Sequence, residues 1–559
     1  MNGKDGGRPE IFKLSQNLFG NEETTMKKAL ALILALVLCL GVLAGCEQKP
    51  AETTKPAETT KPAETTPGAT TPPETQPAAY SFEGKVLDVY SGHAANMDGT
   101  DLNTFIEEAL GIDIQWKVLP EAGIEAALTE RVTPSLIFTT GGTGAGLTTY
   151  GRYGAYVNLW EHQDWMPNFF ALFNDESDPT MVAYKQTYMP SEDELYVAPV
   201  FLGGDVQRYG WMYREDIVAE LGLEIPTDWN SFVDFLRAMK DAYPNSYPFT
   251  MRSSAASVLY SMSEFAQQFG VNYSGNAARD PYTETYYDPG VTDEFRNLIK
   301  CIRQLIDEEL MDEACLGFDT AKWQEAFTNG TSFVTYDKAF QLSNLEPAGQ
   351  QLNPKFSLGW FNNIQFFADA DNSVPFQCRD SGVQGYAWFI TSKCADVELA
   401  CRYLDWLYTE EGRDLMSWGV EGVSYTVDAD GKKQYVDGFD KTYMARYQES
   451  GLIDFNATMA AYSEKCQEMI LDTMAAAAAG GWEKTKTVLG WSTEEQMLID
   501  TYHQGWVDTK SQYLAKFMLG DLDIDDDAAW DAYKEALKAY NVDQLIAAYD
   551  AAYQRFLAK

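Results

Sequence analysis

The sequence of 559 residues has very few histidines and lacks the short motifs of common hydrolases. Its three imidazoles belong to His93, His162 and His503, which stand in unrelated contexts. No H-E-x-x-H zinc motif and no G-x-S-x-G nucleophile elbow occurs, so those two kinds of hydrolase have no support. A glycoside hydrolase needs only two carboxylates at a fixed separation, and 83 acidic residues offer many pairs without singling one out.

Positive charge is also scarce. The chain carries 42 Lys and Arg against 83 Asp and Glu, which gives a formal net charge of −41. Nucleic-acid binding depends on neutralising phosphates, so this composition argues strongly against it, and it disfavours electrostatic attachment to an anionic membrane. The hydrophobic fraction of 45% and the aromatic fraction of 13% are sufficient for a large core. The excess acid is the charge of a solvated, repelling surface.

The sequence has one long uncharged apolar run, and it is too short to span a membrane. Lys27 and Lys28 precede the run Ala29–Leu43, which ends in the sequence LAGC at Cys46. A short basic start and an apolar run are typical of a secretory signal, whereas a membrane span needs about 20 apolar residues. The LAGC ending resembles a bacterial lipobox. It therefore predicts a lipoprotein signal peptide over 26–45 and acylation of Cys46, with a plain cleaved signal or a helical anchor as alternatives.

Three segments are predicted around this signal. Residues 1–25 fit no targeting pattern and predict a misassigned start, with Met26 as the initiator. Residues 46–79 repeat the unit AETTKP and predict a disordered Thr/Pro/Glu linker, because they contain little to bury and their prolines favour extended chain. Residues 80–559 form the predicted body, held by the lipid at the extracellular face of the cell membrane.

Six of the eight cysteines belong to the body, since Cys39 lies in the predicted signal and Cys46 is the predicted lipid site. No C-x-x-C occurs, so a zinc ribbon or a thioredoxin-type site has no support. Export permits disulfides, but the spacing does not give a pairing, and buried free thiols are the alternative. The six are Cys301, Cys315, Cys378, Cys394, Cys401 and Cys466.

The start of the body alternates between strand and helix patterns. Val86–Tyr90 reads as a strand, a helix with an apolar face follows, and apolar residues then alternate with polar ones over 112–118. A further helix near 121–131 leads to a strand at Ser135–Phe138, so the order predicts a helix-covered parallel sheet. The glycine-rich segment TTGGTGAG at 139–146 follows that strand. It is either a ligand-binding loop or a flexible turn, and it matches neither a P-loop nor a dinucleotide fingerprint.

Several motifs then occur in a recognisable order. They include the turn Gly154–Leu159 followed by Pro167 and Asn168, the strand Leu195–Pro199, and the block Tyr213–Trp229. Together with the segment 385–432 and the acidic, Trp-containing tail, they resemble extracellular solute-binding proteins, family 1, of bacterial ABC importers, in their large Gram-positive lipoprotein branch. Asp228 before Trp229, where Thr is usual, and the segment 133–135 depart from the pattern.

This resemblance implies an α/β fold of the periplasmic-binding-protein type II, with two lobes, a hinge and an interlobe cleft. We expect lobe 1 at about 80–203 and 376–420, and lobe 2 at about 204–375 and 421–559. The chain would cross the hinge near 201–208, 376–380 and 420–425. Closure of the lobes around a solute would be the working motion. The implied partners are a small solute and ABC permease subunits, and the protein would act as a monomer.

Candidate ligand-binding residues are the aromatic and charged side chains near these crossings. An oligosaccharide leads as ligand, because sugars offer apolar CH faces and a rim of hydroxyls, while a peptide or another small solute stays open. Core packing is the alternative for each aromatic residue, and a salt bridge or helix cap for each charged one. The candidates are Trp211, Arg252, Trp360, Asp380, Tyr386, Trp388, Trp418, Glu421 and Tyr425.

The sequence leaves two alternative functions, an enzyme and a sensor or adhesin, and one candidate metal, calcium. A surface glycoside-processing enzyme would need a defined carboxylate pair, and a ligand-binding sensor or adhesin would use the same fold without transport. We expect no enzymatic activity and no cofactor. Calcium is considered at Asp521, Asp523, Asp525 and Asp527, which alternate like an EF-hand loop. Asp526 replaces the required Gly and Ala532 the final Glu, so helix capping is the simpler interpretation.

Overall fold

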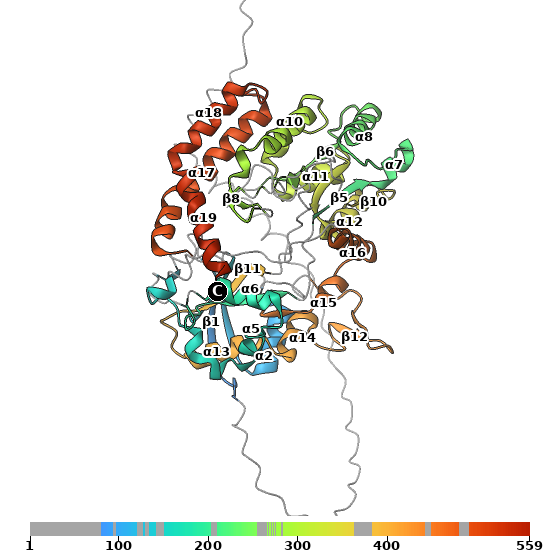
Figure 1. Cartoon of the computed structure of the whole chain (residues 1–559). Helices are drawn as coiled ribbons and strands as arrows, with labels where there is room; N and C mark the ends of the chain where they lie inside the picture. The colour runs from blue at the N-terminus through green and yellow to red at the C-terminus, as the bar shows by residue number, and fades with distance from the viewer. Residues whose placement is uncertain are drawn as a thin grey trace, which may run out of the picture. The chain divides into compact units, whose positions relative to one another are not determined.

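By its internal contacts the chain divides into residues Met1–Ala78 and a compact unit of residues Ala79–Lys559. The predicted signal, Cys46 and the linker lie outside the described residues, as do Cys378 and Asp380. The computed structural model (Figure 1) describes residues 80–92, 97–119, 127–128, 134–140, 150–189, 191–202, 209–253, 265–266, 268–269, 271, 273, 275–280, 283–362, 383–441, 449–479 and 491–558.

The first sheet has six strands in the order β14-β4-β11-β3-β1-β2. Strand β11 pairs antiparallel with both of its neighbours, whereas the other five strands run in one direction. A strand from late in the chain is therefore inserted into a sheet begun near residue 86. The strands are β1 (Val86–Ser91), β2 (Asp113–Val118), β3 (Leu136–Thr140), β4 (Ala198–Leu202), β11 (Val383–Ile390) and β14 (Leu452–Ile453).

Helices and one short hairpin accompany this sheet. The helices are α2 (Asp101–Leu110), η2 (Leu159–Trp165), α5 (Pro167–Phe173), α6 (Pro179–Tyr188), α13 (Val397–Trp406) and α14 (Glu410–Trp418), and the hairpin joins β12 (Tyr425–Val427) to β13 (Lys433–Tyr435). The predicted alternation over 112–118 is confirmed, with Ile114 and Trp116 buried. The predicted helix before it is α2, which Thr100 caps and Gly111 ends in the left-handed region at φ 70°.

The second sheet has four strands in the order β10-β5-β9-β6. They are β5 (Tyr209–Arg214), β6 (Phe249–Thr250), β9 (Val334–Lys338) and β10 (Leu358–Phe361), and a small hairpin pairs β7 (Ala278–Arg279) with β8 (Tyr286–Tyr287). Strand β5 is antiparallel to both β9 and β10, and β6 is parallel to β9.

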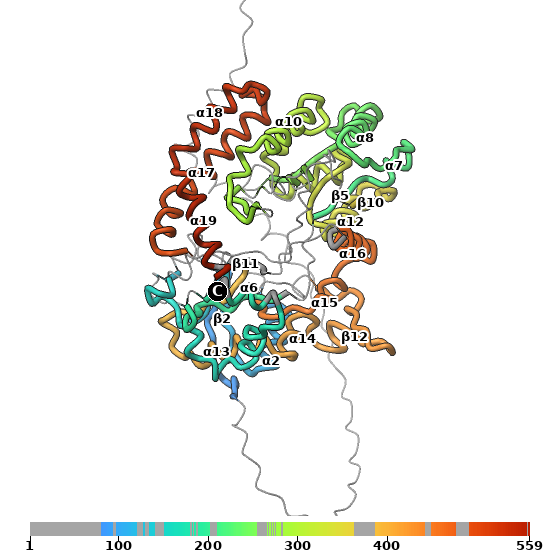
Figure 2. Tube along the Cα trace, viewed as in Figure 1, coloured from blue at the N-terminus to red at the C-terminus, as the bar shows by residue number. Residues whose placement is uncertain are grey.

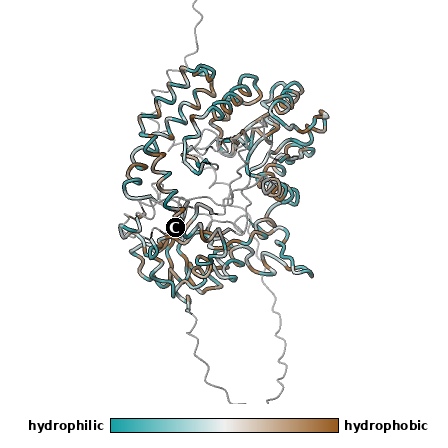
Figure 3. Tube along the Cα trace, in the orientation of Figure 1, coloured by the Kyte–Doolittle hydropathy of each residue, from teal (hydrophilic) through white to brown (hydrophobic). Residues whose placement is uncertain are grey.

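More helices accompany the second sheet than the first. They are α7 (Glu215–Leu221), α8 (Trp229–Ala242), η3 (Pro289–Val291), α10 (Asp293–Asp307), η4 (Glu313–Gly317), α11 (Thr320–Thr328), η5 (Ala339–Gln341), α12 (Leu342–Leu352), α16 (Glu464–Ala479), α17 (Thr493–Leu519), α18 (Asp527–Leu537), η6 (Lys538–Tyr540) and α19 (Val542–Leu557). Hydrophilic and hydrophobic residues alternate along the last helices (Figure 3), and the buried positions of α17 follow a helical stripe. One more short helix, α15 (Phe455–Ala460), follows β14.

The buried side chains form two large cores, one with each sheet. The first core joins residues 87–201 to residues 387–416 and Ile453, and the second joins residues 211–361 to residues 506–545. We call the part built around the first sheet the first body and the part built around the second sheet the second body. In Figure 2 the blue-to-teal and orange parts of the trace share the first body, and the green, yellow and red parts share the second.

The structure differs from the predicted change of lobe at residue 421. Strand β14 pairs with β4 of the first sheet, and Ile453 belongs to the first core. The hairpin is also fixed to α14, because the Tyr435 hydroxyl donates to the Ser417 carbonyl oxygen at 2.6 Å. The chain therefore leaves the first body after residue 453. A two-residue strand has too little pattern to be found in a sequence.

The motifs that suggested the family have structural roles. The Asn158 side chain accepts a hydrogen bond from the Leu195 amide at 2.9 Å, and the Asn168 side chain donates to the Asp405 carboxylate at 2.7 Å. Burial raises the pKa of Asp405, while its hydrogen bonds to Phe169 and Asn168 act in the opposite direction. These residues fix packing, so they indicate a fold rather than a ligand.

One local departure from the family pattern is explained by the chemistry of helix capping. Asp228, which stands where Thr is usual, accepts from the Ser231 amide at 2.8 Å, and the Ser231 hydroxyl accepts from the Asp228 amide at 3.0 Å. This capping box starts α8 as well as a Thr would. Residues 428–431 form the tip of the β12–β13 hairpin, with Gly431 at φ 82°.

Five of the body cysteines lie in the part of the chain that the structure describes, and all five are free thiols. Burial raises the pKa of Cys301, Cys315 and Cys401 to about 12 in each case, so these thiols are poor nucleophiles. The other two are Cys394 and Cys466.

Candidate functional site

Short connections join the carboxyl ends of the strands of the first sheet to those of the second. Strand β4 ends at Leu202 and β5 begins at Tyr209, so seven residue steps join them. Tyr209 lies opposite Lys338, the last residue of β9, and this end of β5 is therefore at the carboxyl edge of the second sheet. Seven steps of extended chain reach no more than about 25 Å. The two carboxyl edges are thus tethered to each other.

The next connection repeats this arrangement. Strand β10 ends at Phe361, beside the start of β5, and β11 begins at Val383 at the carboxyl edge of the first sheet. A third connection leaves that edge after β14 and runs through α15 to α16. Ligands of open α/β sheets bind outside the carboxyl ends of the strands. The topology therefore places the candidate site where these two edges meet.

On the second sheet, this edge carries a buried ion pair. Arg252, just after β6, donates from Nε and Nη2 to both carboxylate oxygens of Asp337 at 2.7 and 2.9 Å. Its Nη1 donates to the Thr320 hydroxyl at 3.0 Å, and its guanidinium lies 5.4 Å from the Trp323 ring centroid. Asp337 has no exposed surface. The pair joins the ends of two strands, and Asp337 is a residue that the sequence did not single out.

On the first sheet, the edge carries a buried carboxylate. Ser91, the last residue of β1, donates its hydroxyl to Glu449, which is 2% exposed. Glu449 adopts φ 57°, a left-handed conformation that is uncommon for a residue other than Gly. The next residue, Ser450, accepts from the Trp388 indole N–H at 2.9 Å. These bonds fasten the segment before β14 to the edge of the sheet.

The structure places the candidate residues of β11 at two depths. Tyr386 lies opposite Thr140 at the edge, is half-buried, and stacks on Phe138 with 5.6 Å between ring centroids. Trp388 is two residues further along the strand, has no exposed surface and packs 4.7 Å from the same ring. Only a partly exposed face can meet a ligand without rearrangement, so Tyr386 suits a ligand contact and Trp388 suits core packing.

The other candidate tryptophans also serve packing. Trp211 has no exposed surface and packs against Phe361 at 5.3 Å, and Trp418 is 1% exposed. Trp360 is half-buried, but its indole N–H donates to Asp472 of α16 at 3.2 Å, so it points to the helix-covered face of the sheet. The alternative interpretation of core packing describes these three side chains.

The last candidates belong to the β12–β13 hairpin rather than to either edge. Glu421 is exposed and bridges to Tyr425, whose ring lies 5.8 Å from Trp418. Lys433 reaches over the Tyr425 ring at 5.2 Å. Glu421 and Tyr425 therefore lie with α14 and the hairpin, whereas Arg252 and Tyr386 lie at the ends of strands of the two sheets.

Sequence reasoning missed three half-buried aromatic residues at the second edge. Tyr209 opens β5 and stacks at 6.0 Å on Tyr336. Phe340 follows the end of β9 and stacks at 5.9 Å on Tyr462, which lies just after α15. An aromatic residue directly after a strand's carboxyl end is a usable signal for Phe340. Tyr462 is distant in sequence, and only the fold brings it there.

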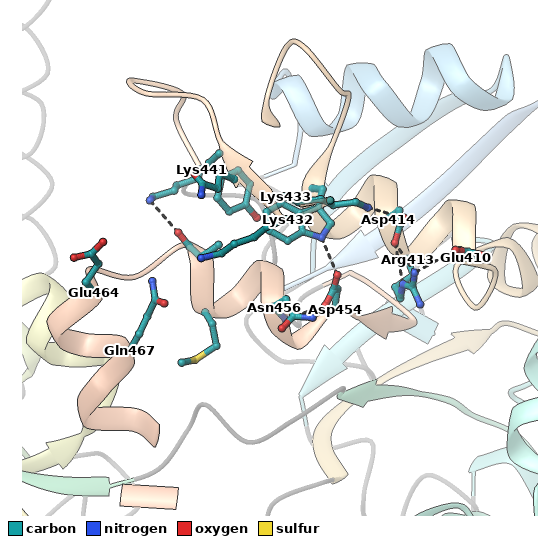
Figure 4. A pocket seen from close by; sticks show the side chains of 16 residues that line it. Glu410, Arg413, Asp414, Lys432, Lys433, Lys441, Asp454, Asn456, Glu464 and Gln467 are labelled. Atoms are coloured by element: carbon teal, nitrogen blue, oxygen red, sulfur yellow. Dashed lines mark hydrogen bonds and ion pairs between the residues drawn. The ribbon is translucent and has the colours of Figure 1, made fainter. Parts of the chain in front are cut away.

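One pocket lies outside the two edges. It has a volume of about 850 Å³ and is bordered by α14, the β12–β13 hairpin, α15 and the start of α16 (Figure 4). Lys433 and Arg413 both bind Asp414 there, at 2.8 and 2.7 Å. None of the edge residues Ser91, Tyr386 and Arg252 lines it.

Metal ligands do not assemble in the described part of the chain, where no group of three or more His, Cys, Asp or Glu side chains is placed to hold an ion. The acidic run considered for calcium makes other contacts. Asp525 binds Lys300 at 2.5 Å, Asp527 binds Arg296 at 2.7 Å, and Asp526 caps α18. Among the residues that were described, none of the helices is long and apolar enough to cross a membrane.

The sequence of residues 81–414 matches the model of the bacterial extracellular solute-binding protein family. This match covers more than half of the chain, so the chain belongs to that family, as its motifs predicted. No curated protein matches it.

Solved structures agree on the fold at low identity. The alginate-binding protein AlgQ2 without calcium ion superposes with a TM-score of 0.66 at 17% identity, over 84% of this chain and 98% of that one. An HMO-binding, ABC-transporter-associated solute-binding protein from Bifidobacterium longum infantis gives a TM-score of 0.63 at 15% identity, over 84% of this chain and 99% of that one. The S. pneumoniae substrate-binding protein FusA, an EF-hand mutant with fructo-nystose, gives 0.63 at 16%, over 85% and 99%. The predicted two-lobed α/β fold of the periplasmic-binding-protein type II is confirmed.

Proposed function

We propose that this protein captures an oligosaccharide outside the cell and delivers it to the permease of an ABC importer. The observation that carries the proposal is the pair of tethered strand edges with half-buried aromatic residues on them. Tyr386 lies on the first edge, and Tyr209, Phe340 and Tyr462 lie on the second. Aromatic faces with a few fixed polar groups suit the CH patches and hydroxyls of sugars.

The neighbours support the same ligand class. Similar structures include proteins that bind alginate, HMO and kestose, and one that serves N-glycan transport. The family comprises binding proteins, so a solute held without chemical change is the simplest function. Acylation of Cys46 would hold the body at the membrane beside the permease. Labelled palmitate that enters the parent chain and not the Cys46→Ser chain would test this anchor.

The experiment is a titration of the processed chain, purified in detergent, with a panel of oligosaccharides and peptides. We expect at least one oligosaccharide to bind with measurable heat and to raise the melting temperature, and the peptides to do neither. Binding of peptides alone would overturn the ligand class. Cleavage of a bound glycan would support the alternative of a surface glycoside-processing enzyme. Normal uptake of the glycan by cells that lack this protein would favour a sensor or adhesin.

A matched pair of variants locates the site. Tyr386→Ala removes a half-exposed ring at the first edge, and we expect affinity for the glycan to fall about tenfold, the loss of one stacking contact of roughly 1.4 kcal/mol. Tyr425→Ala removes a half-buried ring from the hairpin and is expected to leave affinity unchanged. Equal effects of the two substitutions would contradict the placement of the site.

A further inference from the structure

The linker between Cys46 and the body places its basic residues in a way that a spacer does not require. Residues 47–79 contain three of them, Lys49, Lys55 and Lys61, and each is followed directly by a proline. An extended spacer depends on the proline content as a whole, so its lysines could stand anywhere in the repeat. The unit AETTKP therefore preserves the dipeptide Lys-Pro in addition to a composition.

This dipeptide affects one kind of chemistry, hydrolysis by trypsin-like proteases. Such an enzyme holds a basic side chain in its specificity pocket and cuts the peptide bond that follows it, and its histidine protonates the leaving nitrogen. When the next residue is proline, that nitrogen is part of a ring, which fixes φ and crowds the histidine. Each bond after a basic residue of the linker is therefore a poor substrate for these enzymes.

The linker offers no site to chymotrypsin-like proteases either. Residues 47–79 consist only of Ala, Glu, Gln, Lys, Pro, Thr and Gly, whereas a hydrophobic specificity pocket needs a large apolar side chain. The same 33 residues contain five glutamates, and none of them precedes a proline. The sequence thus excludes cleavage after basic and large apolar residues, while bonds after acidic residues stay ordinary.

The first ordinary sites for both kinds of protease belong to the body, where contacts hold their side chains. The Tyr80 ring packs against the first core, 5.2 Å from the Phe82 ring centroid, and the Arg402 guanidinium of α13 lies 5.0 Å from its centroid. Lys85 is the first basic residue after Cys46 that no proline follows, and its ammonium binds Asp396 at 3.2 Å. Both side chains must leave these contacts before they enter a specificity pocket.

The bond after Lys85 is also held by the first sheet. The Lys85 amide donates to the Phe82 carbonyl oxygen, and its own carbonyl oxygen accepts from the Asp113 amide, each at 2.9 Å. Val86, on the other side of the bond, lies opposite Asp113 in the pairing of β1 with β2. A protease acts on locally unfolded chain, so cutting here requires the start of β1 to leave the sheet. Protection by sequence in the linker is thus continued by protection through folding.

We propose that the sequence of residues 47–79 makes the linker resistant to trypsin-like and chymotrypsin-like proteases, so that the body stays attached in surroundings that contain them. This inference rests on the proposed function in one respect, the lipid anchor at Cys46, which is what the body stays attached to. The peptide bonds resist these enzymes with or without the lipid, so the linker and the anchor are tested separately.

The test detects new amino termini between residues 47 and 86 by mass spectrometry, in the processed chain under native conditions. We expect trypsin and chymotrypsin to produce none in the parent chain, and a glutamate-specific protease to cut after Glu52 or Glu58. The glutamate-specific cleavage would show that the linker is accessible to an enzyme. Trypsin cleavage within 47–79 of the parent chain, or no cleavage there by the glutamate-specific protease, would overturn the proposal.

A matched pair of variants isolates the prolines that follow lysine. Pro56→Ala places an ordinary bond after Lys55, and we expect trypsin to cut it at least about tenfold faster than in the parent chain. Pro67→Ala removes a proline that follows Thr66 and is expected to leave the linker resistant. Both positions lie outside the body, so its folding does not decide the result. An uncut Pro56→Ala linker, or equal cutting of the two variants, would refute the role of Lys-Pro.

Chymotrypsin tests the boundary with the body. Thr59→Phe supplies an aromatic side chain within the linker, and we expect rapid cleavage after this position while the bond after Tyr80 stays intact. Equal rates at the two positions in the folded chain would overturn protection by packing. If no palmitate enters the parent chain, the anchor of the proposed function fails, and the protease experiments still decide the resistance. If palmitate enters and trypsin cuts the linker, only the resistance fails.

Discussion

The second sheet carries a two-pronged Arg–Asp pair at each of its two edges, and the pairs differ in what they join. At the carboxyl edge, Arg252 and Asp337 connect the ends of β6 and β9, 85 residues apart. At the opposite edge, Arg214 donates to both oxygens of Asp216, two residues away, at 2.7 and 2.6 Å. The first pair holds two strands beside the candidate cleft, whereas the second fastens the start of α7. The same chemistry therefore supports a site at one edge and a helix at the other.

Truncating each of the two arginines is expected to give the largest difference between the two pairs. Arg252→Met leaves Asp337 charged and without exposed surface, and we expect unfolding free energy to fall by about 3–5 kcal/mol. Arg214→Met leaves Asp216, whose side chain is 18% exposed, and the loss is expected to be clearly smaller. Urea denaturation of both variants measures the difference. Equal losses of unfolding free energy in the two variants would contradict the view that burial makes the Arg252–Asp337 pair more important for stability than the Arg214–Asp216 pair.

The conservative exchange separates stability from binding. Lys keeps the charge but cannot reproduce the two parallel hydrogen bonds of the guanidinium. We expect Arg252→Lys to weaken glycan binding about tenfold, or roughly 1.4 kcal/mol, because the ends of β6 and β9 border the proposed ligand site. Arg214→Lys is expected to leave affinity at the parent value. Calorimetric titration checks both, and a loss of affinity in the Arg214 variant would place the site elsewhere.

A third buried ion pair contains a lysine ammonium in place of the arginine guanidinium, and a lysine can lose its proton within an accessible pH range. Lys510 has no exposed surface, lies 3.3 Å from Asp288 and contacts the Trp506 ring at 3.5 Å. Burial lowers the pKa of Lys510 from 10.5 to about 8, against the opposing effect of Asp288. Between these values Lys510 is more protonated in the unfolded chain than in the folded one, so its own contribution to stability is expected to rise with pH. The buried thiols of Cys301, Cys315 and Cys401, whose pKa is raised to about 12, contribute in the opposite direction.

Urea midpoints of the parent chain and of Lys510→Met are measured at several pH values from 7.5 to about 9.5. Their difference isolates Lys510, because the thiols and tyrosines that titrate in the unfolded state act on both chains alike. We expect this difference to shift in favour of the parent chain as the pH rises. His503 nearby has its pKa lowered by burial and by Lys510, so it stays neutral throughout. A difference between the two chains that stays constant with pH would show that Lys510 keeps its proton over this range.

The smallest effect is expected where an exposed carboxylate serves only a helix end. Asp228→Ala removes the cap of α8 and should lower the urea midpoint slightly, whereas Asp228→Thr should restore it, because both Asp and Thr cap the Ser231 amide. A loss in the Asp228→Thr chain as large as in Asp228→Ala would show that the family's usual Thr is not equivalent here.

Local pattern was sufficient for some of this architecture. The alternation of Ile114 and Trp116 located β2. Strand β14 escaped detection because two residues have no period. The cross-strand partners Arg252 and Asp337 escaped because nothing local links them.

Burial separated the candidates that sequence could not. The sequence does not distinguish Trp211, Trp388 and Trp418 from Tyr386, because an aromatic residue near a crossing can be either buried in the core or exposed at the end of a strand. Their exposed fractions, at most 1% for the three tryptophans, depend on neighbours that arrive from distant segments. Asp380 lies outside the described residues and stays a prediction.

The inserted strand β11 has a consequence for how the chain is made. The ribosome completes β3 and β4 about 180 residues before it reaches β11, which must enter between them. The first body therefore cannot close its hydrogen-bond ladder while the nascent polypeptide is short, and contacts of such long range form slowly. A chain that stays open late in synthesis suits passage through a translocation pore, and one that is truncated before residue 383 would present two unpaired strand flanks prone to aggregation.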